Sequence, residues 1–175
     1  MVYVNDMLIL SSPRDTDALW RGFEKSVEYK DPAAPPQRYL GTLYHFDVFD
    51  PYKPKAPRSL LTSMDDYATN AVQPFEAEFQ KILARVTSPY ITSEDVCEEG
   101  YSPGGFSSSA SSHVAILALL SRIARPDISV AVQRMCRVVT KWTTTHDAQL
   151  IRLYAYLGTT GPIALRAELS PEDLD

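Results

Sequence analysis

The sequence lacks several features that would place it in a specialised class of protein. Its longest uninterrupted apolar run, residues 114–120, is far short of the ~20 residues that a membrane-spanning helix needs. Its two cysteines, Cys97 and Cys136, form no CxxC motif, and its three histidines lie far apart, so neither a disulfide framework nor a zinc-binding spacing is present. The first residues also lack the basic flank and cleavage site of a signal peptide. We therefore expect an intracellular protein, cytoplasmic or nuclear.

Positive net charge is also missing. The chain of 175 residues has 22 acidic and 17 basic side chains, giving a formal net charge of −5 and a pI near 5.2. Such a balance provides no overall field that would attract nucleic acid. The acids, however, gather in residues 94–99 and 168–175, whereas basic side chains cluster in residues 122–141. A local contact with nucleic acid is therefore compatible with the composition, although the composition does not argue for it.

The first part of the chain has alternating β-prone and helical patterns. Residues 2–10 contain two apolar runs on either side of Asn5 and Asp6, which predicts a β-hairpin with these two residues in the turn. Ser12 followed by Pro13 is typical of a helix start, and apolar residues at helical spacing predict a helix over about residues 13–29. Alternating aromatic residues predict strands within residues 38–49.

The middle of the chain predicts two helices and a long loop. Ser63 is a candidate N-cap for a helix that Pro74 interrupts. Apolar residues at helical spacing then predict a second, amphipathic helix over residues 75–86. Residues 87–112 are rich in proline, glycine, serine and acidic residues, which predicts a long surface loop that divides the chain.

The last third has three helical patterns. They cover residues 113–123, residues 126–142, and a segment that begins at a Thr144-x-x-Asp147 cap and ends at Gly158 and Gly161. Residues 163–165 could add one short strand. Hairpins followed by a mostly helical half predict an α+β fold.

Several short motifs occur in a fixed order along this pattern. Residues 3–10 have the sequence YVNDMLIL, and residues 38–43 have RYLGTL. Tyr67 begins a Y-x3-AV-x2-F pattern, and a Thr-Ser-Pro step lies at residues 87–89. The most specific block is ARPDI at residues 124–128, followed at fixed offsets by these positions: Ala131, Val132, Arg137, His146, Arg152, Tyr156, Leu157 and Thr160.

This ordered series resembles the C-terminal part of copia-type LTR-retrotransposon reverse transcriptases, which are RNA-directed DNA polymerases. The resemblance implies a partial palm with two hairpins in residues 1–57 and thumb-like helices with a long loop in residues 58–106. It further implies a helical, connection-like segment in residues 107–168 and an acidic tail in residues 169–175. The fingers, the upstream palm and the RNase H domain of the family have no counterpart among these residues, so we expect a truncated reverse-transcriptase fold.

The resemblance also implies a chemistry. Members of the family hold Mg²⁺ with three carboxylates, two of them in a YVDD hairpin. Asn5 stands where the first of these aspartates would be, and a neutral carboxamide is a weaker ligand for Mg²⁺ than a carboxylate. Asp6 is then the one remaining catalytic and metal-binding candidate. We expect this chain alone to bind no metal and to be inactive as a nucleotidyltransferase.

Two groups of residues are candidates for contact with an RNA/DNA template–primer. By the resemblance, Tyr39, Leu40 and Gly41 are primer-grip candidates; the alternative for Gly41 is a strand glycine at a bulge. Helical spacing aligns further candidates, Arg134, Arg137 and Lys141, on a basic face, for which the alternative is a solvated surface.

Other roles remain open at the sequence level. Arg125 and Asp127 can pair with each other and cap the local backbone, or Arg125 can contact a phosphate. His146 is expected to be a packing or capping residue. For the whole chain, the alternatives are a non-enzymatic helical module that binds nucleic acid or protein, and a decayed gene product. An open N-terminal hairpin also predicts self-association.

Overall fold

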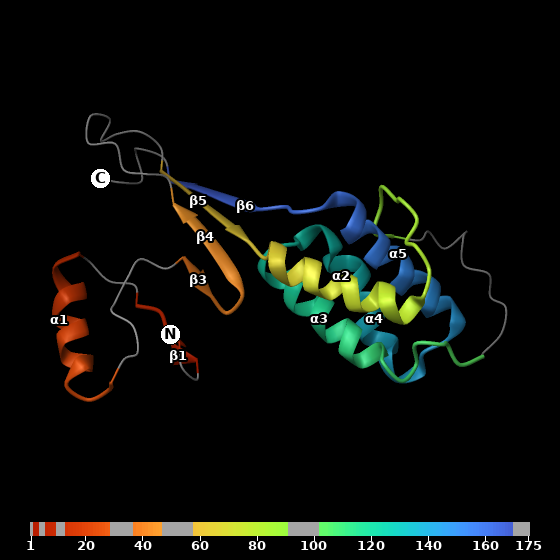
Figure 1. Ribbon diagram of the computed structural model, residues 1–175, viewed down its shortest axis with the longest axis horizontal. Helices are drawn as coiled ribbons and strands as arrows, with labels where there is room; N and C mark the ends of the chain where they lie inside the picture. The colour runs from red at the N-terminus through yellow and green to blue at the C-terminus, as the bar shows by residue number, and fades with distance from the viewer. Residues whose placement is uncertain are drawn as a thin grey trace.

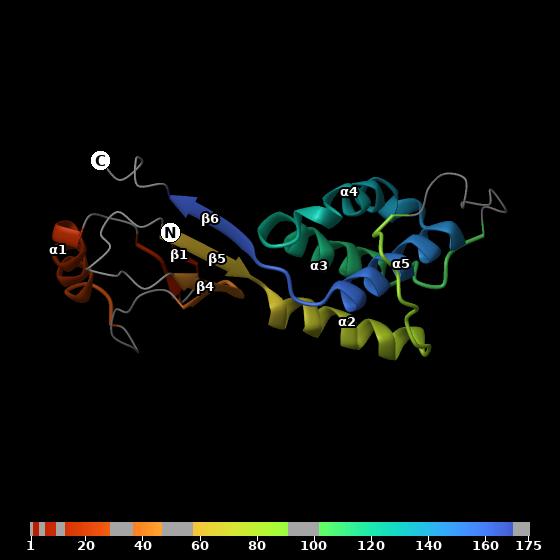
Figure 2. The ribbon, with the colours of Figure 1, turned by 90° about the horizontal axis from the view of Figure 1, so that it is seen from above.

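The chain forms an α+β structure in which most of the helices lie apart from an antiparallel sheet (Figure 1). The computed structural model describes residues 2–3, 6–9, 13–28, 37–46, 58–90 and 102–169. Figures 1 and 2 both show helices α2, α3, α4 and α5 gathered at one end of an elongated molecule, with the sheet and α1 at the other. Among the helices so described, none is long and apolar enough to cross a membrane.

The N-terminal hairpin is confirmed, but its register differs from the prediction. Strands β1 (Val2–Tyr3) and β2 (Asp6–Met7) pair antiparallel, with Tyr3 opposite Asp6. Asp6 therefore lies in a strand, and its predicted place in the turn is wrong. Asn5 and Ser12 lie outside the described residues. Helix α1 (Pro13–Glu24) begins where predicted and ends earlier, in a turn in which the N–H of Val27 donates to the carbonyl of Phe23.

A four-stranded antiparallel sheet brings together segments that are distant in sequence. Its order is β3 (Arg38–Tyr39), β4 (Thr42–Phe46), β5 (Arg58–Ser63), β6 (Leu165–Leu169). Strands within residues 38–46 are confirmed, and residues 47–49 lie outside the described part. The predicted N-cap at Ser63 is wrong, because Ser63 is the last residue of β5 and pairs with Leu43. The C-terminal strand lies at Leu165–Leu169 rather than at residues 163–165, because its position is set by pairing with β5.

Helix α2 (Asp65–Phe79) runs without interruption through Pro74. The prediction of a break at Pro74 and of a second helix over residues 75–86 is therefore wrong. Proline removes one helical hydrogen bond, but the next residue, Phe75, is fully buried and stacks on Tyr154 with ring centroids 3.9 Å apart. This tertiary contact holds the helix on both sides of the proline. The helix ends where Gln80 takes a left-handed φ of 56°, and Ile82 beyond it is 96% exposed.

The three C-terminal helical patterns are confirmed, with changes at their ends. Helix α3 covers Ala110–Ile123 and α5 covers Thr144–Thr160. Between them, α4 (Ser129–Val138) is flanked by the 3₁₀ turns η2 (Pro126–Ile128) and η3 (Val139–Lys141), so the expected single helix is divided. Helix α5 continues through Gly158 and ends at Gly161, whose φ is 62°.

One hydrophobic core unites the four helices of the larger end. It extends from Met64 before α2 to Leu157 near the end of α5 and includes Phe106. Residues 87–90 and 102–109 lie outside the helices and strands, and most of residues 102–109 are exposed, which agrees with the predicted surface loop. Gly104 and Phe106 are nevertheless buried, and residues 110–112 belong to α3, so the loop prediction is wrong there. Residues 91–101 of that predicted loop lie outside the described part. The helical core thus contains side chains from α2, from Phe106 and from the three helices that follow it.

Candidate nucleic-acid interface

For the hairpin that carries Asp6, the structure gives the backbone pairing of its two strands. Strands β1 and β2 pair in a two-stranded sheet of their own, separate from the four-stranded sheet. The side chain of Asp6 is not described, and Asn5 is outside the described residues. Across the part of the chain that the structure describes, no three His, Cys, Asp or Glu side chains come together to hold a metal ion. The role of Asp6 as a metal ligand therefore stays a prediction.

The three primer-grip candidates form a tight hairpin turn between β3 and β4. Tyr39 pairs with Thr42, which leaves Leu40 and Gly41 as the two central residues. Both have positive φ, 49° for Leu40 and 79° for Gly41, as a type I′ turn requires. Gly41 therefore occupies a turn position and not a strand bulge. Leu40 is the unusual residue, because the left-handed region costs a residue with a Cβ about 1–2 kcal/mol.

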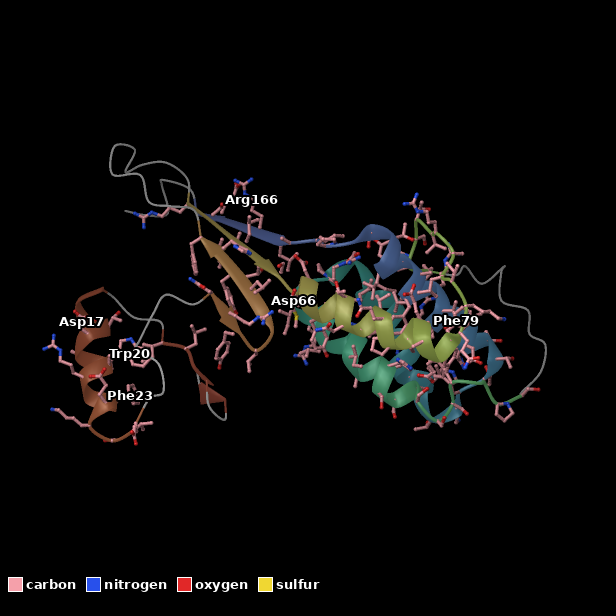
Figure 3. The ribbon with its side chains drawn as sticks, viewed as in Figure 1. Asp17, Trp20, Phe23, Asp66, Phe79 and Arg166 are labelled. Carbon is pink, nitrogen blue, oxygen red and sulfur yellow. The ribbon has the colours of Figure 1, made fainter. Side chains whose placement is uncertain are left out.

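The tip of this hairpin lies against the start of α2. A Cβ on Gly41 would lie 3.5 Å from Met64 Cε, and Arg38 forms an exposed ion pair with Asp66 (Figure 3). Tyr39 is only 7% exposed, and among the described residues its hydroxyl is the one buried side-chain polar atom without a hydrogen-bond partner. Leu40, in contrast, is 37% exposed. Of the three candidates, Leu40 is the one whose side chain reaches solvent.

The three basic candidates do not form one continuous row. Arg134 is exposed, with its guanidinium 4.5 Å from the ring centre of Tyr90, and both residues line one pocket. Arg137 is exposed in the last turn of α4, and Lys141 ends η3. Because a 3₁₀ turn advances 120° per residue and an α-helix 100°, Lys141 is rotated by roughly 60° from the position that an unbroken helix would give it.

Arg125 lies inside the fold, where it joins η2 to the end of α5. Its guanidinium is 2% exposed and donates to Asp127 Oδ1 and Oδ2, with Nε–Oδ1 at 3.0 Å and Nη2–Oδ2 at 2.9 Å. It also donates to Thr160 Oγ1 at 2.8 Å and to the Gly161 carbonyl at 3.2 Å. Although burial raises the pKa of Asp127, the hydrogen bonds and charge of Arg125 bring that pKa below its usual value. These contacts favour the structural role of Arg125 over a phosphate contact.

A polar network that extends from the helical core to the surface was not predicted from the sequence. His113 on α3 lies between two partners, with its Nδ1 3.0 Å from Tyr154 Oη and its Nε2 3.1 Å from Glu78 Oε2. Ser109 Oγ donates to Glu78 Oε1 at 2.7 Å, and this hydrogen bond is the main reason that the pKa of Glu78 is lowered. Burial raises the pKa of Tyr154. The partners come from three helices, so no local sequence signal could have revealed the network.

The start of α5 carries a second unpredicted arrangement. Asp147 accepts hydrogen bonds from the N–H groups of Gly105 at 2.6 Å and Phe106 at 3.2 Å, and from Trp142 Nε1 at 2.7 Å. The N-cap is Thr143 rather than Thr144, and the Nδ1 of His146 accepts from the Thr143 N–H at 2.9 Å, which completes a capping box. The expected capping role of His146 is confirmed. Burial lowers its pKa, against an opposing effect of the Asp147 charge.

Motif residues from separate blocks of the sequence contact one another in the fold. Arg125 of the ARPDI block binds Thr160 of the last block. Arg152 Nε donates to the Ser88 carbonyl at 3.1 Å, which joins the last block to the Thr-Ser-Pro step.

Comparison of the chain with protein-family models, with curated proteins and with solved structures found no match.

Proposed function

We propose that these residues are the C-terminal part of the polymerase region of a copia-type reverse transcriptase, with the fold of its palm remnant, thumb and connection. In this proposal the chain contributes to holding the RNA/DNA template–primer rather than to the chemical step. Support comes from the ordered motif series and from the contacts between its blocks, such as Arg125 with Thr160 and Arg152 with Ser88. A set of residues that meet in space is a better basis for a resemblance than isolated matches along the chain.

The observation that carries the proposal is the Leu40–Gly41 turn. A type I′ turn favours Asn-Gly, so leucine at its first central position is unfavourable for the backbone. Its side chain is also partly exposed at the hairpin tip. Backbone strain of this kind persists where surrounding structure enforces it, and it is frequent at ligand-binding sites. An apolar side chain held at a rigid tip can pack against the sugar and base of a primer end.

The tip also has a firm support. Tyr39 is buried beneath it, and Gly41 approaches Met64, which is 1% exposed. A site is more precise when its contact residue stands on packed elements. The hairpin therefore offers one exposed apolar contact on a buried base, which suits the positioning of a strand end.

The first experiment compares two leucine substitutions. Leu40→Asn should raise the free energy of unfolding by about 0.5–1 kcal/mol, because asparagine tolerates the left-handed region, and should weaken binding of a labelled primed template about three-fold or more. Leu119→Asn is the matched control, since Leu119 is a similarly exposed leucine on α3. Fluorescence anisotropy at low salt measures the affinity. Equal affinity for both variants would remove the primer-grip assignment.

The second experiment tests the basic residues. Given the net charge, we expect micromolar binding that weakens steeply with salt. The double variant Arg137→Ala/Lys141→Ala should reduce the slope of log K against log salt by about two, roughly one unit for each lost phosphate contact. Arg21→Ala/Arg85→Ala removes the same charge from exposed positions elsewhere. Identical slopes for the two double variants would indicate a solvated face. Nanomolar binding at near-physiological salt would contradict the weak contact proposed here.

The chain could instead act as a non-enzymatic module that binds nucleic acid or protein. The observation in favour is that α2, α3, α4 and α5 enclose a core of their own, including Phe75, Leu117 and Leu153. Such a module would use its helical end and would not depend on the Leu40 turn. Undiminished binding by Leu40→Asn together with weakened binding by Arg137→Ala/Lys141→Ala would favour this second function.

A further inference from the structure

Strand β6 is an outer strand of the four-stranded sheet. The other outer strand, β3, has two residues, whereas β6 has five and pairs with β5 from Arg58 to Thr62. Within the part of the chain that the structure describes, no strand pairs with the far side of β6. An outer strand of this length presents backbone N–H and C=O groups that can pair with another strand. Its sequence, LRAEL, contains neither proline nor lysine, which commonly protect such edges.

The sequence of β6 is complementary to itself in the antiparallel direction. Around a two-fold axis at Ala167, each Arg166 lies opposite Glu168 of the second copy, and this pairing occurs twice. Opposite charges across an antiparallel pair stabilise it, and like charges in those positions destabilise it. A shift of one residue would lose both pairs and move every side chain to the wrong face. The charges therefore favour this register of a β6–β6 contact over a shift of one residue.

The side chains of β6 also fit such an arrangement. Residues opposite each other in the ladder share a face, so Arg166 lies on the face of Leu61, and Ala167 lies on the face of Leu60 and Phe46. Arg166 and Glu168 are largely exposed, with Nε–Oε1 at 2.8 Å within the chain, and Figure 3 shows Arg166 directed away from the sheet. Phe46, on the opposite face, is 53% exposed. Arg166 and Glu168 can therefore exchange their contact within the chain for contacts with a second copy. The face that carries Ala167, Leu60 and Phe46 would continue across the two-fold axis into the sheet of that copy.

We infer that β6 is an interaction surface for a second copy of this chain. The two copies pair antiparallel through β6, joining two four-stranded sheets into one with a two-fold axis at Ala167. Such an interface is isologous, because the same strand serves both copies. A five-residue strand contact is small beside the ~1,200–2,000 Å² of a stable interface, so the association is weak and depends on concentration.

The experiment exchanges the charges on the full chain. Sedimentation velocity over a range of concentrations should show a monomer–dimer equilibrium for the unmodified chain. Arg166→Glu and Glu168→Arg should each weaken the dimer about ten-fold or more, because each replaces two attractive pairs with two repulsive ones. The double exchange Arg166→Glu/Glu168→Arg should restore the original affinity.

The decisive sample is an equimolar mixture of the two single variants. Each variant lacks the Arg166–Glu168 pair within its own chain, yet in the mixture every cross-copy pair is attractive again. The mixture should therefore form a heterodimer, which also shows that the single variants are folded. A chain that stays monomeric at all concentrations would overturn the inference. So would single variants that dimerise as before, which would point to another surface such as the N-terminal hairpin, or a mixture that fails to associate.

Discussion

Removing the Arg125 guanidinium should be among the most damaging single changes in the helical end. The side chain is 2% exposed and holds three groups at once: the Asp127 carboxylate, the Thr160 hydroxyl and the Gly161 carbonyl. In Arg125→Ala these acceptors lose their donor. Taking one partner from a buried ion pair typically costs 3–5 kcal/mol, because the other charge stays without compensation. The Asp127 side chain is 31% exposed, so water restores part of the loss, and we expect about 3 kcal/mol.

The loss of stability should depend on how many of these hydrogen bonds the side chain at position 125 can still donate. Arg125→Lys keeps the charge but cannot serve carboxylate, hydroxyl and carbonyl together, so about 1–2 kcal/mol should be lost. Arg125→Met/Asp127→Ala removes both charges and should cost less than the sum of the two single changes, with a coupling of about 1–2 kcal/mol. Because the pKa of Asp127 is lowered in the folded chain, its contribution is present above its usual value of 3.8 and is lost as the pH falls below it.

Urea unfolding followed by far-ultraviolet circular dichroism measures these differences. Arg122→Ala is the matched control, because Arg122 is an exposed arginine near the end of α3 and its loss should cost less than 0.5 kcal/mol. The slope of the free energy with urea should stay constant, so that the midpoint alone reports stability. A loss below about 1 kcal/mol for Arg125→Ala, or a loss equal to that of Arg122→Ala, would refute the reasoning.

Three further outcomes are expected. Since burial lowers the pKa of His146, its capping contribution of about 1 kcal/mol is present above pH 6.5 and is lost on acidification. The melting temperature of His146→Gln should therefore change less between pH 7 and pH 5 than that of the unmodified chain. Amides of Val2 and Met7 in the isolated two-stranded sheet should exchange with deuterium much faster than those of Val132 and Met135 in α4, and equal protection would contradict this. Under the proposed function, these 175 residues offer Asp6 but neither of the two further carboxylates that the chemistry needs, so the purified chain should not extend a primed RNA template with Mg²⁺ or Mn²⁺, and Asn5→Asp should not restore activity; template-dependent incorporation would disprove this.

The helical half could be predicted because its signals are local. Apolar residues at helical spacing place α3, α4 and α5 to within a few residues. The errors arise where a tertiary contact outweighs a local preference. Pro74 is tolerated because Phe75 stacks on Tyr154. Phe106 is buried within the predicted surface loop, and its N–H and that of Gly105 donate to Asp147. Neither partner is near in sequence, so no window of neighbouring residues contains the information.

The sheet was harder to predict for the same reason. Strand β5 has no strict alternation, and β6 is defined by its pairing with β5 more than a hundred residues earlier, as in the match of Leu60 with Ala167. Of the candidate site, the position of Leu40 and Gly41 in a hairpin was implied by the resemblance, but the positive φ of Leu40 was not. Leucine carries no signal for that conformation, which depends on the tight pairing of Tyr39 with Thr42.

The connections between the two ends of the molecule make the hairpin tip dependent on the helical core. Strand β5 passes into α2 through the single residue Met64, which is buried in the core and also lies against Gly41. Strand β6 leaves α5 just beyond Gly161, whose carbonyl Arg125 binds. Residues of the helical end therefore hold both connections to the sheet, the one from β5 to α2 and the one from α5 to β6. Met64 thus joins the Leu40–Gly41 turn to the helical core, whereas Arg125 acts at the other connection, where α5 leads into β6.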